Sequence, residues 1–265
     1  MVDFQELVAR YEINHTFGTK LHVLEGYGIV FICDDSGSMN TPLDDLSGPF
    51  DKMPSRWDEL KQTVSIVVNL ASVFDSDGVD VYFLNRKPVF HVRNSKQLVP
   101  IFIIPSSGPT PIVPVFRHVL RDKQHEIEEP ELLILLATDG VSTDNQGHRD
   151  IRSFEYVLKQ ERKPTNRIPV TIIACTDDDD DCVEYLNEWD KKIPNLDIHQ
   201  SLDNHYFERK LKSTSSDFDK MRLHHEAFPP FNKDHTVYMV AAIIPRSYVL
   251  SSLEADLQEI QQKSK

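Results

Sequence analysis

The sequence predicts an α/β protein with a doubly wound, mostly parallel central sheet, one short antiparallel edge strand and helices on both faces. Two observations predict this class. Short, continuous apolar runs alternate along the chain with longer amphipathic stretches, which is the pattern of β-α units. The apolar runs also lack the apolar and polar alternation of a half-exposed strand, as expected where helices cover both faces of a sheet.

Five apolar runs are predicted to be parallel strands. They are Gly28 to Cys33, Val79 to Leu84, Leu132 to Ala137, Val170 to Ala174 and, with a weaker pattern, Leu196 to His199. Turn-forming residues follow the second run, at Asn85, Lys87 and Pro88. They indicate a hairpin, so the segment PVFHV (88–92) is predicted to be the antiparallel edge strand, where a proline is tolerated.

Three amphipathic stretches are predicted to be crossover helices, because their apolar residues recur at helical spacing. They are RWDELKQTVSIVVNLASVF (56–74), VFRHVLRDKQHEI (115–127) and RSFEYVLKQ (152–160). The stretch SKQLVPIFII is ambiguous, since Pro100 weakens either a long helix or a central strand. The acidic run from Asp177 to Asp181 is interpreted as the start of a helix over VEYLNEWDKKI, rather than as a second cation site.

The regular alternation spans residues 26–205, which is the predicted extent of a single domain. An N-terminal helical extension is expected over residues 1–25. A C-terminal extension is expected over residues 206–265 and is predicted to pack on the domain. Within the domain, the segment from Asn40 to Ser55 is predicted to be an exposed loop, because it is rich in proline, glycine and aspartate.

Charge and composition narrow the class of partner. With 29 Lys and Arg residues against 42 Asp and Glu, the formal charge of −13 argues against nucleic acid or an anionic membrane surface and favours cations. The longest apolar runs, such as LLILLA, are far shorter than the roughly 18 residues that cross a bilayer. Because the start MVDFQELVARY lacks a signal-peptide pattern and three cysteines suggest no disulfide framework, we expect a cytoplasmic protein without membrane insertion.

Oxygen-bearing side chains follow the first predicted strand. Asp34, Ser36 and Ser38 alternate directly after it, and Gly37 allows the backbone to turn sharply. In open parallel sheets, ligands bind at the carboxyl ends of the strands. Carboxylate and hydroxyl oxygens are hard ligands, which suit Mg²⁺, Mn²⁺ or Ca²⁺. The sequence therefore predicts part of a metal site here.

Two later loops supply further oxygens at the same edge of the sheet. Asp139 follows the apolar run LLILLA, and Thr110 closes the segment SSGPT before a helix expected to have a proline at its first position. Five oxygen ligands from the three loops are therefore expected to face one point: Asp34, Ser36, Ser38, Asp139 and a hydroxyl of the segment SSGPT (106–110). Two carboxylates only balance a divalent cation, which favours an anionic sixth ligand. Without the ion, we expect the two carboxylates to face each other with no counter-charge.

The sequence resembles the von Willebrand factor type A family, whose metal-ion-dependent adhesion site has the pattern Asp-x-Ser-x-Ser, then Thr, then Asp. All five positions occur in the family order within residues 26–205, as Asp34, Ser36, Ser38, Thr110 and Asp139. In addition, the segment DGVDVYFLN (77–85) resembles the second strand of intracellular eukaryotic members. Two features depart from the pattern. The loop from Asn40 to Ser55 is longer than usual, and Gly-Pro-Thr-Pro (108–111) replaces the commoner Gly-Gly-Thr-Pro.

The resemblance implies a Rossmann-like fold and a site that holds Mg²⁺, or Mn²⁺ or Ca²⁺. It implies that the two serines and Thr110 coordinate the ion directly or by exchange, and that Asp34 and Asp139 act partly through water. A carboxylate of an Asp or Glu residue on a protein partner would fill the open position. The expected function is therefore a divalent-cation-dependent protein-binding module.

These residues also allow other interpretations. An Asp-x-Ser-x-Ser motif by itself is most often a helix N-cap with its turn. Asp35, which lies between the predicted ligands, is expected to have a structural or surface role. No phosphate-binding Gly-x-x-x-x-Gly-Lys-Ser/Thr motif occurs, and Ser36 is not in a nucleophile elbow, so catalysis is not expected. The alternative is a metal-dependent phosphatase or hydrolase that uses the same Mg²⁺ site. The cysteines, at 33, 175 and 182, are predicted to be buried thiols.

Overall fold

The computed structural model describes residues 22–42, 55–74, 77–125, 131–144, 146–175 and 181–200. Several sequence-based expectations fall outside these ranges. They are the N-terminal extension before His22, most of the loop from Asn40 to Ser55, the acidic residues before Asp181 and the C-terminal extension. Among the residues described, no helix is long and apolar enough to cross a membrane.

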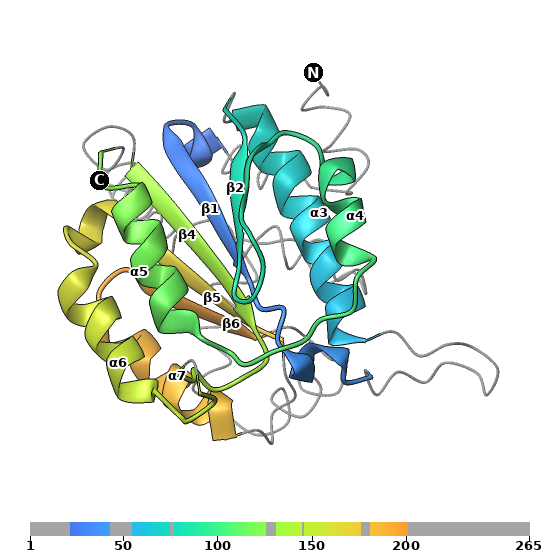
Figure 1. The fold of residues 1–265 in the computed structure, drawn as a ribbon. Helices are drawn as coiled ribbons and strands as arrows, with labels where there is room; N and C mark the ends of the chain where they lie inside the picture. Colours follow the sequence, from blue (N-terminus) through green and yellow to red (C-terminus); the bar gives the residue numbers. More distant parts are fainter. Residues whose placement is uncertain are drawn as a thin grey trace, which may run out of the picture.

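The described residues form a six-stranded sheet in the order β3-β2-β1-β4-β5-β6 (Figure 1). The strands are β1 (Tyr27–Cys33), β2 (Val79–Phe83), β3 (Val89–Val92), β4 (Glu131–Thr138), β5 (Val170–Ala174) and β6 (Leu196–Gln200). Neighbouring strands are parallel except β2 and β3, which are antiparallel. The predicted α/β class, with a mostly parallel sheet and one antiparallel edge strand, is therefore confirmed.

The helices of the described ranges follow the amphipathic stretches. They are α3 (Arg56–Phe74), α4 (Val99–Phe102), α5 (Ile112–Asp122), α6 (Ile151–Tyr156) and α7 (Asp181–Lys192). Short helical turns are η1 (His22–Leu24), η2 (Gly37–Asn40), η3 (Ser95–Leu98), the π-helical η4 (Val157–Glu161) and η5 (Thr165–Arg167). The bounds predicted for α3 are confirmed, and α7 begins at Asp181, within the acidic run interpreted as a helix start.

One predicted helix has different bounds in the structure, and the ambiguous stretch proves to be helical. The helix predicted over residues 115–127 begins earlier, at Ile112, and ends at Asp122. It starts before Pro114 because the amides of the first turn have no intrahelical acceptor, so a proline there costs no hydrogen bond. The proline expected at its first position, Pro111, is the N-cap residue instead. The ambiguous stretch containing Pro100 forms η3 and then α4, with the proline in the first turn of α4.

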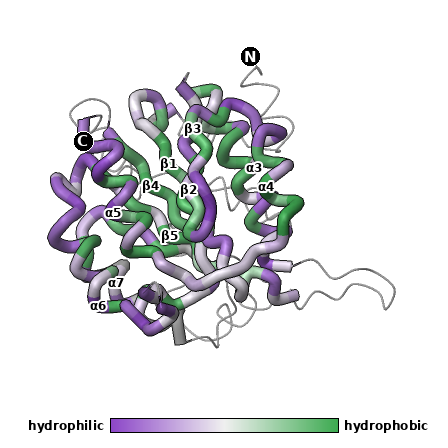
Figure 2. The backbone as a smooth tube through the Cα atoms, in the orientation of Figure 1, coloured by the Kyte–Doolittle hydropathy of each residue, from purple (hydrophilic) through white to green (hydrophobic). Residues whose placement is uncertain are grey.

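Helices cover both faces of the sheet. One buried cluster joins α3 and α4 to strand residues such as Phe31 and Leu133. A second cluster joins α5, α6 and α7 to the alternate strand residues, such as Val30 and Ile134. Successive strand residues point to opposite faces, so the continuous apolar strands supply both layers. Figure 2 shows these apolar strands at the centre, between the helices.

The chain diverges at the carboxyl ends of the two central strands. Cys33 of β1 pairs with Ala137 of β4, and the Asp34 N–H extends the ladder by donating to the Ala137 carbonyl at 2.9 Å. After β1 the chain leads to α3 on one face, whereas after β4 it leads to α6 on the other. Loops that separate in this way leave a crevice at the end of the strands, where ligands bind in open α/β sheets.

Arg162, which directly follows η4, binds the residues that precede β5 and β6, at the amino ends of these strands. Its guanidinium is buried and donates to the carbonyls of Ile168 and Asn195 at 2.7 and 3.0 Å, and to that of Pro194 at 2.6 Å. Burial lowers the pKa of Arg162 to about 10, so the side chain remains charged at neutral pH. A charged donor thus satisfies several backbone carbonyls at once.

We predict that Arg162→Met lowers the free energy of unfolding by about 3 kcal/mol, because buried carbonyls lose a charged donor. The melting temperature should fall by roughly 6 to 12 °C, at about 2 to 4 °C per kcal/mol for a chain of this size. Arg152→Met, at an exposed position of α6, is the matched control and should be nearly neutral. Similar melting temperatures for the two variants in calorimetric scans would show that the hydrogen bonds of Arg162 do not stabilise the fold.

Candidate metal site

The predicted ligands from the first motif lie at the carboxyl end of β1 and face β4. Asp34 Oδ1 accepts a hydrogen bond from the Ser36 N–H at 2.9 Å, which fixes the turn into η2. Ser36 Oγ lies 3.0 Å from Ser38 Oγ. Ser38 Oγ in turn donates to Asp139 Oδ1 at 2.7 Å. A chain of hydrogen bonds therefore connects the two serines to the carboxylate that follows β4.

Thr110 reaches the same cluster from the loop before α5. A Cβ atom built on Gly140 would lie 3.4 Å from Thr110 Oγ1 and 3.9 Å from Ser38 Oγ. The absence of a side chain at Gly140 therefore keeps the space beside these two hydroxyl groups free, and a larger residue at this position would fill it. Thr143 holds the threonine loop in place, since its Oγ1 accepts from the Thr110 N–H at 3.0 Å and its N–H donates to the Thr110 carbonyl at 2.9 Å.

Backbone hydrogen bonds join the first loop to the threonine loop. The Gly37 N–H donates to the Gly108 carbonyl at 3.0 Å, and the Ser107 N–H donates to the Asp35 carbonyl at 2.8 Å. Gly108 has a φ of +109°, which favours glycine, and a Cβ there would lie 2.6 Å from Asn85 Oδ1. Main-chain hydrogen bonds therefore fix these two loops relative to each other.

Asp35 has a structural role and is not at the surface. It is fully buried, and its Oδ1 accepts from the Asn85 N–H at 2.7 Å. Its Oδ2 lies 3.1 Å from Arg86 Nε, which supplies the counter-charge. The surface alternative is wrong because the side chain is buried and contacts Asn85 and Arg86. Asp35 thus ties the loop after β1 to the residues that follow β2.

Burial disfavours the charged forms of both ligand carboxylates, and the charge of Asp139 adds to this effect at Asp34. Burial, together with the charge of Asp139, raises the pKa of Asp34 to about 7, although hydrogen bonds from Ser36 and Thr138 oppose the shift. Thr138 Oγ1 donates to Asp34 Oδ2 at 2.5 Å. Burial also raises the pKa of Asp139, against hydrogen bonds from Ser38 and Arg56. Asp34 is therefore the carboxylate whose charge is least well compensated.

Arg56 is a part of the site that the sequence motifs did not identify. Its Nη1 lies 3.1 Å from Asp139 Oδ2, and the two residues are 83 positions apart. The expectation that both carboxylates lack a counter-charge is therefore wrong for Asp139. From the sequence alone, Arg56 could be assigned only as the first residue of a predicted helix that follows a loop. Helical periodicity does not indicate that the side chain of this residue contacts Asp139, which follows a distant strand.

The set of donor atoms fits a hard divalent cation. Asp34 and Asp139 supply carboxylates, and two serines and a threonine supply hydroxyls, so Mg²⁺, Mn²⁺ and Ca²⁺ suit the site better than softer metals. The described residues hold no group of three or more His, Cys, Asp or Glu side chains that could hold a metal ion by themselves. The Cys33 and Cys175 thiols are buried, as predicted, and burial raises their pKa. The side chain of Cys182 lies outside the described residues.

Comparisons with known proteins give no assignment of family. No protein-family model and no curated protein matches the sequence. Among solved structures, the PilB minor pilin from Streptococcus sanguinis matches with a TM-score of 0.46 and 16% identity, over 74% of this chain and 61% of the pilin chain. Its D319A mutant matches over the same shares, with a TM-score of 0.48 and 14% identity. The chain thus spans less than two thirds of the length of these pilin chains.

We predict that the charge of Asp34 destabilises the metal-free protein as the pH rises. Because the folded-state pKa of about 7 lies above the ordinary value of 3.8, the folded protein binds a proton that the unfolded chain releases. The contribution of Asp34 to stability therefore falls between about pH 4 and pH 7. Asp34→Asn removes this titration, so its free energy of unfolding relative to wild type should increase between pH 5 and pH 8.

Urea titrations of both proteins in EDTA at the two pH values measure this difference. Asp144→Asn is the control, because the Asp144 side chain is partly exposed and its pKa is lowered, chiefly by the His148 N–H, so it stays charged from pH 5 to pH 8. A difference between wild type and Asp34→Asn that stays constant from pH 5 to pH 8 would show that Asp34 is not a strained charge.

Proposed function

We propose that the chain is a von Willebrand factor type A domain with a metal-ion-dependent adhesion site, and that it acts as a divalent-cation-dependent protein-binding module. The observation that carries this proposal is the convergence of five oxygen-bearing side chains, from three separated motifs, at the carboxyl edge of β1 and β4. The strand order, which reverses between β1 and β4, supports a doubly wound, Rossmann-like fold of this type.

In this proposal the ligands to Mg²⁺, or to Mn²⁺ or Ca²⁺, are Asp34, Ser36, Ser38, Thr110 and Asp139. The hydroxyl groups suit a dual role. Each has one proton and two lone pairs, so Ser38 can keep donating to Asp139 while an unused lone pair faces a cation. When bound, the ion supplies a positive charge with an open position, which attracts an anionic ligand. Deprotonation of Asp34 accompanies metal binding, so metal affinity falls below about pH 7.

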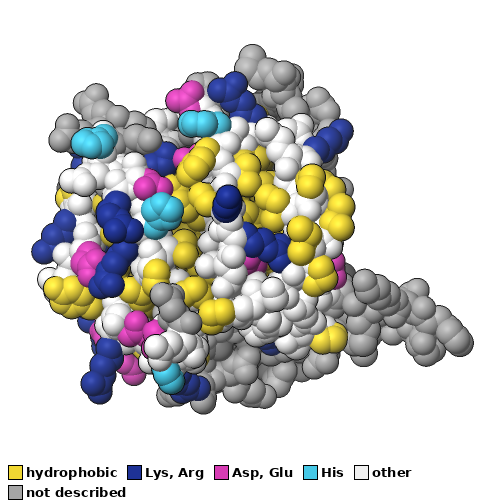
Figure 3. All heavy atoms as spheres, viewed as in Figure 1, with side chains coloured by type: hydrophobic (Ala, Val, Ile, Leu, Met, Phe, Trp, Pro, Cys, Tyr) yellow, Lys and Arg dark blue, Asp and Glu magenta, His cyan; other side chains and the backbone are white. Residues whose placement is uncertain are grey.

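The surface beside the site supports a protein as the ligand. Val99, Ile103 and Ile104 are exposed on α4 and the turn that follows it, with Ile103 exposed by 71%. Figure 3 shows hydrophobic side chains gathered on this part of the surface. They directly precede the loop that carries Thr110. A protein that presents an Asp or Glu residue beside apolar residues can use both features, because interface cores favour apolar contacts.

The first test of this proposal is metal-dependent stability. Free Mg²⁺ at one hundred times its dissociation constant should stabilise the wild type by about 2.7 kcal/mol. This corresponds to a rise in melting temperature of roughly 5 to 11 °C for a chain of this size. Asp34→Ala should gain nothing. Thermal scans in EDTA and in excess metal make the comparison, and a wild type that is indifferent to Mg²⁺, Mn²⁺ and Ca²⁺ alike would rule out the site.

The second test separates metal binding from partner binding at Thr110. We predict that Thr110→Ala retains Mn²⁺ within about tenfold of wild-type affinity, because four other oxygen ligands remain, yet loses the partner. Calorimetric titration measures Mn²⁺ binding. Capture from cell lysate in Mg²⁺ and in EDTA identifies the partner, with Asp34→Ala as the metal-free control.

Exchange of acidic residues on the captured partner for their amides then tests for the carboxylate anchor, and one such exchange should abolish binding. If every amide variant bound unchanged, or if Thr110→Ala lost Mn²⁺ as completely as Asp34→Ala, the proposed role of the ion would be wrong. If the protein released phosphate from a model phosphate ester, and Asp34→Ala abolished this activity, the hydrolase alternative would be favoured instead.

A further inference from the structure

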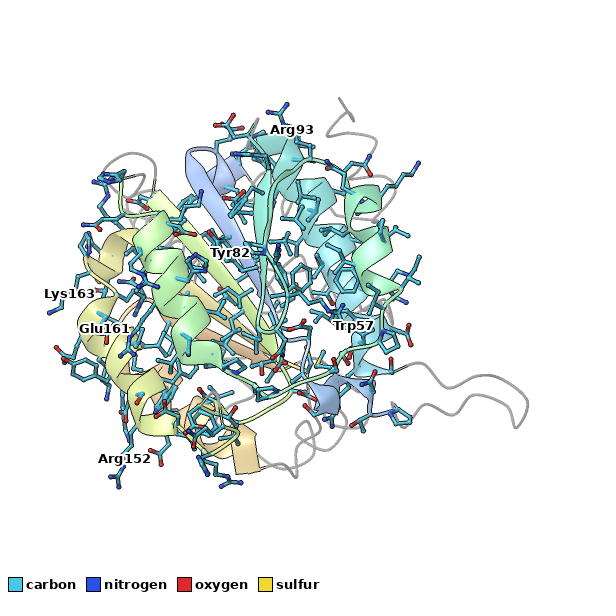
Figure 4. All side chains as sticks on the ribbon, viewed as in Figure 1. Trp57, Tyr82, Arg93, Arg152, Glu161 and Lys163 are labelled. Atoms are coloured by element: carbon cyan, nitrogen blue, oxygen red, sulfur yellow. The ribbon has the colours of Figure 1, made fainter. Side chains whose placement is uncertain are left out.

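Arg56 is held in a defined position at the start of α3. Its N–H donates to the Thr41 carbonyl at 3.0 Å, and its side chain is only 11% exposed. The next residue, Trp57, is buried, and its Nε1 donates to the Phe102 carbonyl at 3.2 Å. Figure 4 labels Trp57 at the end of α3 nearest the candidate site. The start of this helix is therefore anchored, and Arg56 is not a loose surface side chain.

The guanidinium of Arg56 contacts the carboxylate that the proposed metal ion needs. Asp139 Oδ1 accepts from Ser38 Oγ at 2.7 Å, and Asp139 Oδ2 lies 3.1 Å from Arg56 Nη1. The Asp139 side chain is completely buried, so this ion pair is poorly screened by solvent. In the metal-free protein, Arg56 thus supplies part of the positive charge that a bound cation would supply.

The same charge has the opposite effect once a cation is bound. Asp34 and Asp139 balance a divalent ion, so the guanidinium leaves the loaded site with a net positive charge. Two positive groups at one carboxylate repel each other, which weakens metal binding. An added anion relieves that repulsion. Because coupling between two ligands is reciprocal, an anion should then strengthen metal binding, and the metal should strengthen anion binding.

We propose that Arg56 sets the charge of this site, so that it opposes metal binding when no partner is present and couples metal binding to capture of an anionic group. The inference rests on the proposed function and adds a residue that determines specificity for a carboxylate. Arg56 disfavours a metal-loaded site without its partner and favours anionic partners over neutral ones. Its role differs from that of Arg86, whose charge is matched by Asp35 away from the ligand oxygens.

The test is calorimetric titration of the full chain with Mn²⁺. Arg56→Gln should bind Mn²⁺ about tenfold more tightly than wild type, the size expected when one partly buried like charge is removed. Arg56→Lys keeps the charge and should stay within about threefold of wild type. Arg117→Gln is the matched control, because it removes an arginine from an ion pair with Glu161 on α5 and η4, and it should change nothing.

Acetate serves as the anionic probe, added at constant ionic strength. It should tighten Mn²⁺ binding more in wild type than in Arg56→Gln. Association of Mn²⁺ with acetate in solution is common to both titrations, so the difference between the two proteins isolates the effect of Arg56. Thermal unfolding in EDTA establishes that each variant folds. If Arg56→Gln does not fold, Arg56→Met replaces it, because methionine retains an apolar stem in the same position.

The outcomes separate this inference from the function on which it rests. Tighter Mn²⁺ binding by Arg56→Gln, with a smaller effect of acetate, supports the role of Arg56. Unchanged or weaker Mn²⁺ binding by the folded variant overturns that role and leaves the metal site standing. A wild type that binds neither Mn²⁺, Mg²⁺ nor Ca²⁺ overturns both.

Discussion

Two carboxylates buried at the ends of adjacent parallel strands are the feature on which the rest of this site depends. Asp34 and Asp139 follow β1 and β4, whose pairing in register fixes their separation. Buried charge is costly unless it is paired or hydrogen-bonded. The neighbouring side chains reduce that cost in part, since Thr138 donates to Asp34 while Ser38 and Arg56 donate to Asp139. The raised pKa of Asp34 shows that the compensation is incomplete. A divalent cation would complete it.

The fold supplies the rigidity that such a site requires. The loop after β1 is tied to the residues after β2 through Asp35 and Arg86, and to the threonine loop through Gly37 and Gly108. Arg86 also lies over the ring of Trp57, with its guanidinium carbon 5.1 Å from the ring centroid, and this packing connects the loops to the start of α3. Loops braced in this way hold the candidate ligand oxygens in place without an ion, so we expect little ordering to oppose metal binding.

The sequence predicts the scaffold well because the signals that it uses are local. Continuous apolar runs identified the parallel strands of the described residues and the hairpin signal identified β3, each end within one residue, and helical periodicity identified α3 completely. The end of α5 was placed too late, at residue 127 instead of Asp122, whereas its start at Ile112 lies one residue after the proline expected at its first position. The candidate ligands could be recognised since their motifs directly follow strands or precede a helix. Arg56 and the pair of Asp35 with Arg86 could not, because these contacts depend on side-chain directions across the fold.

The central claim is that the five oxygen-bearing side chains of three loops hold one divalent cation. Crystals of the full chain grown in MnCl₂, with diffraction recorded for the anomalous signal of manganese, test it most directly. We predict a single strong anomalous peak at the carboxyl edge of β1 and β4, with serine hydroxyl oxygens and Thr110 or Asp139 around it at coordination distance. A well-ordered crystal without manganese between Asp34 and Asp139, at metal concentrations that saturate known sites of this kind, would contradict it.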